Sequence, residues 1–190
     1  MTMNTVSSVR LLHRHVAPMR TVGVGLAAGL VGTLAMDTLL YVRYRRSGGT
    51  TGFRRWEFSA DVDTWDQAPA PAQMGKRVFE GLFGHQLPDS RAALVNNVTH
   101  WGYGIATGLP YALLAGSLPT PKIRYGAPFG AGVWATSYVV LPVAGLYQPI
   151  WKYDARVLAK DLSAHLAYGL STAAIFKVLA GGNRPHVPRS

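Results

Sequence analysis

Cysteine is absent from this chain of 190 residues. Its absence excludes disulfides, thiolate metal sites and cysteine nucleophiles, and with them zinc ribbons, redox motifs and cysteine hydrolases. Charged residues are scarce as well, at 15% of the chain against about 25% in a typical soluble domain. Because 48% of the residues are hydrophobic and 21 are glycine, this shortage of charge indicates a membrane protein.

Acidic residues are also few, and 9 of them face 19 Lys and Arg, which leaves a net charge of +10. A basic chain can bind nucleic acid. Here the basic residues fall between apolar stretches, as they do in membrane proteins, and no RNA-binding or helix-turn-helix signature accompanies them. We therefore predict no nucleic-acid partner. The sequence also lacks a G-x-S-x-G elbow, a phosphate loop and an HExxH motif, so the motifs predict no catalytic residue, metal or cofactor.

Four apolar stretches are long enough to cross about 30 Å of hydrocarbon as helices. They predict an all-α membrane protein, a four-transmembrane-helix bundle in which a polar, partly helical segment (43–97) joins the first two helices. The predicted spans are residues 21–42, 98–117, 126–147 and 162–180.

The predicted spans form a single membrane domain over residues 21–180. A basic segment, residues 1–20, precedes it, and a disordered tail, residues 181–190, follows it. The first span is longer than the apolar core of a signal peptide, about 7–15 residues, and is interpreted as an uncleaved helix.

The polar segment contains an amphipathic stretch, MGKRVFEGLFG (residues 74–84), with apolar residues at helical spacing. A helix lying on the bilayer surface and a helix capping the bundle fit this stretch equally well.

Orientation follows from the basic residues between the spans. The side that holds residues 43–97 and 148–161 carries 11 Lys and Arg, and the side with both termini and residues 118–125 carries 8. Because basic loops stay inside, segments 43–97 and 148–161 are predicted to be cytoplasmic.

Small residues four apart recur in the spans, and this spacing lets helix backbones approach closely in lipid. They predict helix packing within the chain. Dimerisation, or contact with another membrane protein through such a face, is the alternative. The GxxxG pairs are Gly25 and Gly29, Gly104 and Gly108, and Gly126 and Gly130.

Polar side chains within spans are costly in lipid and therefore need a reason. The antiparallel order of the spans places six of them in the leaflet that faces segment 43–97. We predict that they form one polar cluster, either a structural hydrogen-bond cluster or a site for a metal, a proton relay or a catalytic pair. The candidates are Asp37, His100, Tyr103, Tyr147, Asp161 and His165.

Four stretches resemble an uncharacterised family of small actinobacterial inner-membrane proteins, and the spacing of the spans is distantly similar to that of YagU-like proteins. The stretches are WDQAPAPAQMGKRVFEGLF, NNVTHWGYG, VWATSYVVLPVAGLYQPIWKYDA and LAKDLSAHLAYG. The resemblance covers roughly residues 20–180 and implies a four-helix protein of the bacterial plasma membrane. It supplies no catalytic residue, but it points to residues 100–104 and 153–165.

The function predicted from these observations is a structural or accessory role in the membrane rather than catalysis. A small oligomeric transporter or proton-linked channel that uses the Asp/His cluster is the first alternative. A membrane enzyme that acts on a lipid or quinone, with His100, Asp161 and His165 as acid–base or metal groups, is the second.

Overall fold

The computed structural model describes residues 18–118 and 120–181, and in these residues every regular element is helical. The prediction of an all-α chain is confirmed. Most of the basic segment 1–20 and of the tail 181–190 lies outside the described residues. The elements are α1 (Pro18–Arg46), α2 (Phe53–Glu57), α3 (Ala70–Phe83), η1 (Asp89–Arg91), α4 (Ala92–Gly116), η2 (Ile123–Tyr125), α5 (Gly126–Val143), η3 (Ile150–Lys152) and α6 (Ala155–Gly181).

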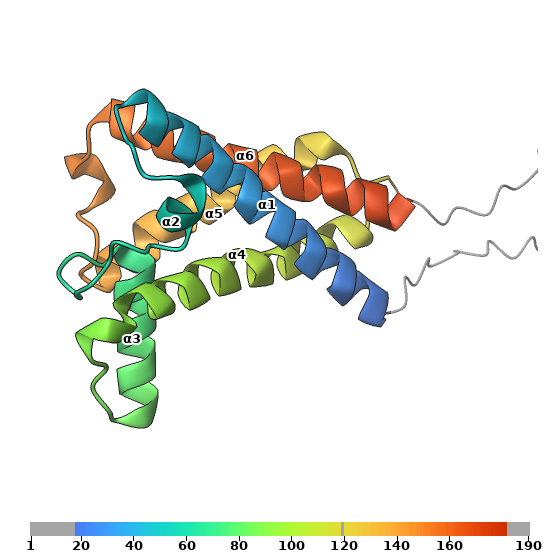
Figure 1. Ribbon diagram of the computed structural model, residues 1–190. Coiled ribbons are helices and arrows are strands. Elements are labelled where there is room, and N and C mark those ends of the chain that lie inside the picture. The colour runs from blue at the N-terminus through green and yellow to red at the C-terminus, as the bar shows by residue number, and fades with distance from the viewer. Residues whose placement is uncertain (1–17, 119, 182–190) are drawn as a thin grey trace, which may run out of the picture.

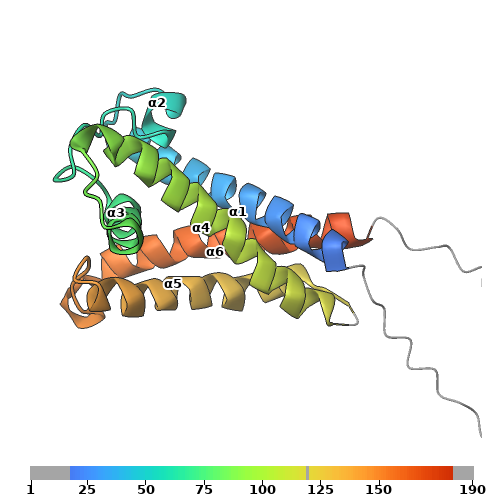
Figure 2. The ribbon, with the colours of Figure 1, turned by 90° about the horizontal axis from the view of Figure 1, so that it is seen from below.

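Four long helices, α1, α4, α5 and α6, form an elongated bundle (Figure 1). Helix α1 packs against both α4 and α6, and α5 packs against α6. In Figure 2, α4 crosses the other helices obliquely. The end of α1, the start of α4, the end of α5 and the start of α6 meet at one end of the bundle, together with α2 and α3. We call this the covered end.

Two of the helices are long and apolar enough to cross a membrane, Met19–Arg46 and Ala155–Gly181. The prediction of four spans is thus supported by length and composition for two helices. Helix α4 contains Asn96, Asn97 and His100, and α5 has only 18 residues, or about 27 Å at 1.5 Å per residue.

The helix boundaries differ from those of the predicted spans, and local contacts explain these differences. Helix α6 begins at Ala155 rather than at residue 162, because the Asp154 carboxylate accepts a hydrogen bond from the backbone N–H of Arg156 at 2.7 Å and caps the helix. Half of the predicted connector 148–161 is therefore helix. Helix α5 ends at Val143 rather than at 147, before Gly145 turns the chain with a φ of 64°. Helix α4 starts at Ala92 and α1 continues to Arg46.

Glycines set the distance between the long helices. A Cβ on Gly29 would run into the backbone of Gly104 and Ile105, and one on Gly108 would run into the backbone of Gly25 and Gly29. Helices α5 and α6 approach in the same way, where Gly126 and Gly130 lie against the backbone of Gly169 and His165. All six glycines of the GxxxG pairs thus contact another helix of the same chain.

Helix α2 rests on the covered end through aromatic rings. Tyr41 of α1 contacts Phe53 and Trp56 of α2, with ring centroids 5.1 and 5.4 Å apart, and Tyr44 lies 5.9 Å from Trp56. These contacts turn the next residue, Glu57, inward. Helix α3 packs against α4 but runs across the long axis of the bundle, so that it is seen end-on in Figure 2.

Candidate functional site

A histidine and two carboxylates meet where α1, α2 and α4 come together. Asp37 comes from α1, Glu57 from α2 and His100 from α4, and one ligand atom from each lies within 4.8 Å of the other two. The His100 Nε2 atom is 2.9 Å from Asp37 Oδ2. Asp37 and Glu57 are 3% and 7% exposed, and the His100 side chain is 27% exposed. We call these three residues the inter-helix site.

The glycine contacts between α1 and α4 bring Asp37 and His100 together. On α1, Gly25, Gly29, Thr33 and Asp37 follow one another four residues apart and so share a face. On α4, His100, Gly104 and Gly108 have the same spacing. The glycines let these faces touch, and a Cβ on Gly104 would run into Thr33. One helical turn further along both faces, Asp37 lies opposite His100.

Glu57 is the unusual member of the inter-helix site. Both of its carboxylate oxygens are buried, and neither accepts a hydrogen bond from the residues that the structure describes. Burial raises the pKa of Glu57 to about 7, and the negative charge of Asp37 adds to this effect, while His100 and Trp101 oppose it. Near neutral pH this carboxyl group therefore gains or loses its proton readily.

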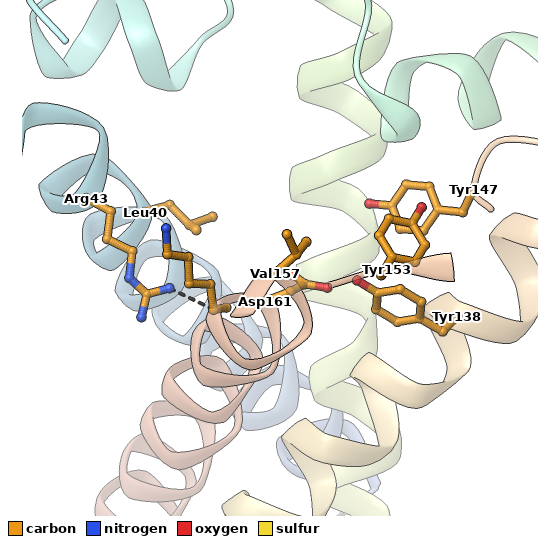
Figure 3. A pocket seen from close by; sticks show the side chains of 8 residues that line it. Leu40, Arg43, Tyr138, Tyr147, Tyr153, Val157 and Asp161 are labelled. Atoms are coloured by element: carbon orange, nitrogen blue, oxygen red, sulfur yellow. Dashed lines mark hydrogen bonds between the residues drawn. The ribbon is translucent and has the colours of Figure 1, made fainter. Parts of the chain in front are cut away.

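A second group lies on α6 at the covered end. His165 Nδ1 is 3.0 Å from the backbone carbonyl of Asp161 and 3.4 Å from its carboxylate. The Tyr138 hydroxyl points toward Asp161 (Figure 3), and the rings of Tyr138, Tyr147 and Tyr153 pack on one another with centroids 5.4–6.1 Å apart. We call these five residues the α6 group.

A cavity of about 440 Å³ opens beside the α6 group. Arg43 of α1 lies on the far wall (Figure 3). Its guanidinium donates hydrogen bonds to the Lys160 carbonyl at 2.7 Å and to the Ser163 hydroxyl at 2.8 Å. The cavity is lined by Leu40, Arg43, Tyr138, Tyr147, Tyr153, Val157, Lys160 and Asp161.

The structure distributes the six candidate polar residues over three places. Asp37 and His100 form one pair, and Asp161 and His165 form another with Tyr147 nearby. Tyr103 belongs to neither group, because its half-exposed side chain lines a separate cavity of about 590 Å³ between α4 and α5. The sequence predicts a common depth for all six, but depth alone does not determine which of them are neighbours.

Sequence reasoning missed Glu57, which lies in the polar segment 43–97. The signal that could have identified it is its position in FRRWEF (residues 53–58), directly after an aromatic residue that needs burial.

The two groups differ in what they can do chemically. Two carboxylates and an imidazole are ligands that suit a divalent metal of borderline softness, and they can also hold a shared proton. The α6 group offers one acid, one imidazole and three phenols beside an open cavity, an arrangement suited to an amphiphilic molecule.

No family model matches the chain, and neither the curated proteins nor the solved structures give a match. The resemblance to the actinobacterial family therefore stays a prediction, and the functional argument depends on the geometry of the two groups.

Proposed function

We propose that the chain is a multi-pass integral membrane protein of the bacterial plasma membrane with a structural or accessory role, and that α1, α4, α5 and α6 all cross the bilayer. The observation that carries this proposal is the distribution of side chains. Small residues lie between the helices, while large apolar residues point outward from all four, as expected where lipid rather than water is the solvent. The outward residues include Leu30, Leu34, Leu113, Leu114, Val139, Val143, Leu170 and Val178.

Helix α3 supports the membrane location and suggests its depth. It lies across the bundle axis and exposes Val78, Phe79, Leu82 and Phe83. A helix in this orientation runs parallel to the bilayer surface when the bundle spans it, so its exposed apolar residues can enter the interface. The sequence allowed either a helix on the bilayer surface or a helix that caps the bundle. The surface location accounts for the apolar residues of α3 that α4 leaves uncovered.

The covered end faces the cytoplasm in this proposal. Basic residues gather there, at Arg43, Arg45, Arg46, Arg54 and Arg55, and loops rich in Lys and Arg remain on the cytoplasmic side. Because the glycine faces are occupied by helices of the same chain, an accessory partner would contact the outward apolar faces or α3.

The absence of cysteine makes single-cysteine labelling a clean test of this topology. We expect Ser47→Cys and Asp89→Cys to react with a membrane-impermeant maleimide only after cells are opened, and Thr120→Cys to react in intact spheroplasts. Leu114→Cys and Val139→Cys should stay unlabelled in membranes and react after the protein is denatured. Labelling of Leu114→Cys or Val139→Cys in intact membranes, or release of the chain by alkaline carbonate, would contradict the proposal.

A membrane enzyme that acts on a lipid or quinone is a second candidate, supported by the cavity beside the α6 group. Its apolar wall and three phenols suit an amphiphile with a polar head, next to an acid and an imidazole that can transfer a proton. Native mass spectrometry should find a bound amphiphile, and Val157→Trp, which fills the cavity, should remove it. Val178→Trp, on the exposed side of the same helix, is the control. An amphiphile retained by Val157→Trp would contradict this role for the cavity.

A further inference from the structure

The carboxylate of Glu57 is buried at the inter-helix site without a hydrogen-bond donor among the described residues. Burial of a polar group without a hydrogen-bond partner is costly, because the group loses its contacts with water and gains none in return. The contacts of Tyr41 and Tyr44 with α2 hold Glu57 toward Asp37, which is itself an acid. Two buried carboxylates that face each other are stabilised by a proton or by a cation between them.

A second unpartnered group lies at the same place. Asn96 stands one turn before His100 on α4, and its amide nitrogen donates to the Ser59 hydroxyl at 2.6 Å, two residues beyond Glu57. The Asn96 Oδ1 atom is buried and accepts no hydrogen bond from the residues the structure describes. A buried amide oxygen without a partner therefore lies one helical turn from His100 on the same face of α4.

From this geometry we infer that Asp37, Glu57 and His100 form a binding site for one divalent transition metal ion of the zinc or manganese type. An imidazole nitrogen with two carboxylate oxygens is a mixed donor set that such ions accept. Three protein ligands leave a fourth position for water or for another oxygen.

The distances need only a small adjustment. Ligands about 2.1 Å from a tetrahedral zinc ion are ~3.4 Å from one another. The three ligand atoms already lie within 4.8 Å, and the closest pair, His100 Nε2 and Asp37 Oδ2, is 2.9 Å apart. Metal binding would therefore need the His100–Asp37 pair to open by about 0.5 Å and the Glu57 carboxylate to move inward.

The charges also balance. A divalent cation neutralises the two carboxylates while His100 stays uncharged, so the buried site has no net charge. Trp101 adds an indole N–H that is buried and has no other partner in the described part of the chain. It lies close enough to Glu57 to act on its carboxylate, as the groups around metal ligands commonly do.

The metal would join elements that are separate in the sequence. Asp37 and His100 belong to helices α1 and α4, whereas Glu57 comes from the segment that covers the end of the bundle. Metal binding would therefore fasten this segment to the bundle. A metal site at this position goes beyond the proposed accessory role and does not depend on that role.

The test is elemental analysis and zinc or manganese titration of the full-length protein, extracted without chelator through a tag that contains no histidine. We expect one metal ion per chain and at least a tenfold loss of affinity in Glu57→Gln and in Asp37→Asn. Glu57→Gln keeps the shape of the side chain and removes a buried charge, so it should fold, as circular dichroism and gel filtration will show. If Asp37→Asn does not fold, the metal affinity of Glu57→Gln alone tests the proposal.

Asp161→Asn is the matched control, because it alters the other Asp–His pair and should bind metal like the wild type. Binding of cobalt in place of zinc should give visible absorption bands that change in His100→Gln. A wild-type protein that takes up neither zinc nor manganese would overturn the proposal. Equal binding by wild type and Glu57→Gln would also overturn it, because the metal would then sit elsewhere, for example on exposed His85 or on the histidines near the chain ends.

Discussion

Two Asp–His pairs lie toward the same end of this bundle, yet they are built differently. Asp37 and His100 come from two helices and are 63 positions apart in the sequence, whereas Asp161 and His165 are neighbours on one helix. In the first pair the acid is buried, with 4% of its side chain exposed, and the histidine is 27% exposed. In the second pair the acid is 30% exposed and the histidine 12%.

The difference shows that the same two residue types can have different consequences for stability. A pair that joins two helices contributes to the tertiary structure, and losing either partner leaves the other charge buried. A pair four residues apart on one helix adds a few tenths of a kcal/mol when its charges reach solvent. The inter-helix site also contains the buried carboxylate of Glu57, while the α6 group lines a cavity of about 440 Å³.

The largest expected effect comes from removing each histidine. We expect His100→Ala to lower the free energy of unfolding by about 3 kcal/mol, because Asp37 is left buried beside a second acid. His165→Ala should cost about 1–2 kcal/mol, mainly through lost packing, because water can solvate the partly exposed Asp161. Unfolding in mixed detergent micelles measures both. Equal losses in the free energy of unfolding would show that the two pairs contribute equally to stability.

A pH-dependent effect is expected next, at the inter-helix site. In metal-free protein the pKa of Glu57 is raised from 4.5 to about 7, first by burial and then by Asp37. The folded state therefore keeps a proton that the unfolded chain loses. The stability that this proton confers is complete below pH 4.5 and is lost as the pH rises through 7, by up to ~1.4 kcal/mol for each pH unit.

Thermal unfolding of chelator-treated protein between pH 5 and pH 8 measures this loss of stability. Glu57→Gln cannot titrate at this position and should flatten the dependence relative to the wild type. His100 and Asp37 face Glu57 and contribute their own titration, which the Glu57→Gln protein retains. A wild-type slope identical to that of Glu57→Gln would show that Glu57 is charged in the fold.

The all-helical fold could be predicted from the sequence because its apolar stretches are long and nearly free of charge. The helix ends could not, since they depend on single contacts such as the Asp154 cap on α6. Within the candidate site, Asp161 and His165 could be paired from their spacing alone. The meeting of Asp37 and His100 was predicted from their common depth, and the four-residue spacing of Gly25, Gly29, Thr33 and Asp37 gives its structural reason.

The pairing of side chains across the helices could not be predicted. A prediction from depth treats residues at one level as neighbours, but Asp37 pairs with His100 across α1 and α4, whereas Asp161 pairs with His165 within α6. Glu57 was hidden for a related reason. Its burial depends on the ring contacts of Trp56 with Tyr41 and Tyr44, and such packing leaves no periodic signal in a segment of five helical residues.

A further effect on stability distinguishes the two regions by their glycines. Gly108→Ala should cost about 1–3 kcal/mol, because its Cβ would meet the backbone of Gly25 and Gly29 and push α4 away from α1. Gly102→Ala, in the same helix but facing open space, should be neutral or stabilising by roughly 0.5 kcal/mol. Gly130→Ala should separate α5 from α6 at a similar cost.

If Asp37 and His100 are held together by the approach of α1 to α4, Gly108→Ala should also weaken metal binding and reduce the pH dependence assigned to Glu57. Gly130→Ala should leave both unchanged, because it acts on the helices of the α6 group. Zinc titration of Gly108→Ala, Gly102→Ala and Gly130→Ala measures the metal affinity, and thermal unfolding of the same variants between pH 5 and pH 8 measures the pH dependence. An equal weakening of metal binding by Gly130→Ala would mean that the bundle moves as one body. The two Asp–His pairs would then share a single packing dependence despite their different construction.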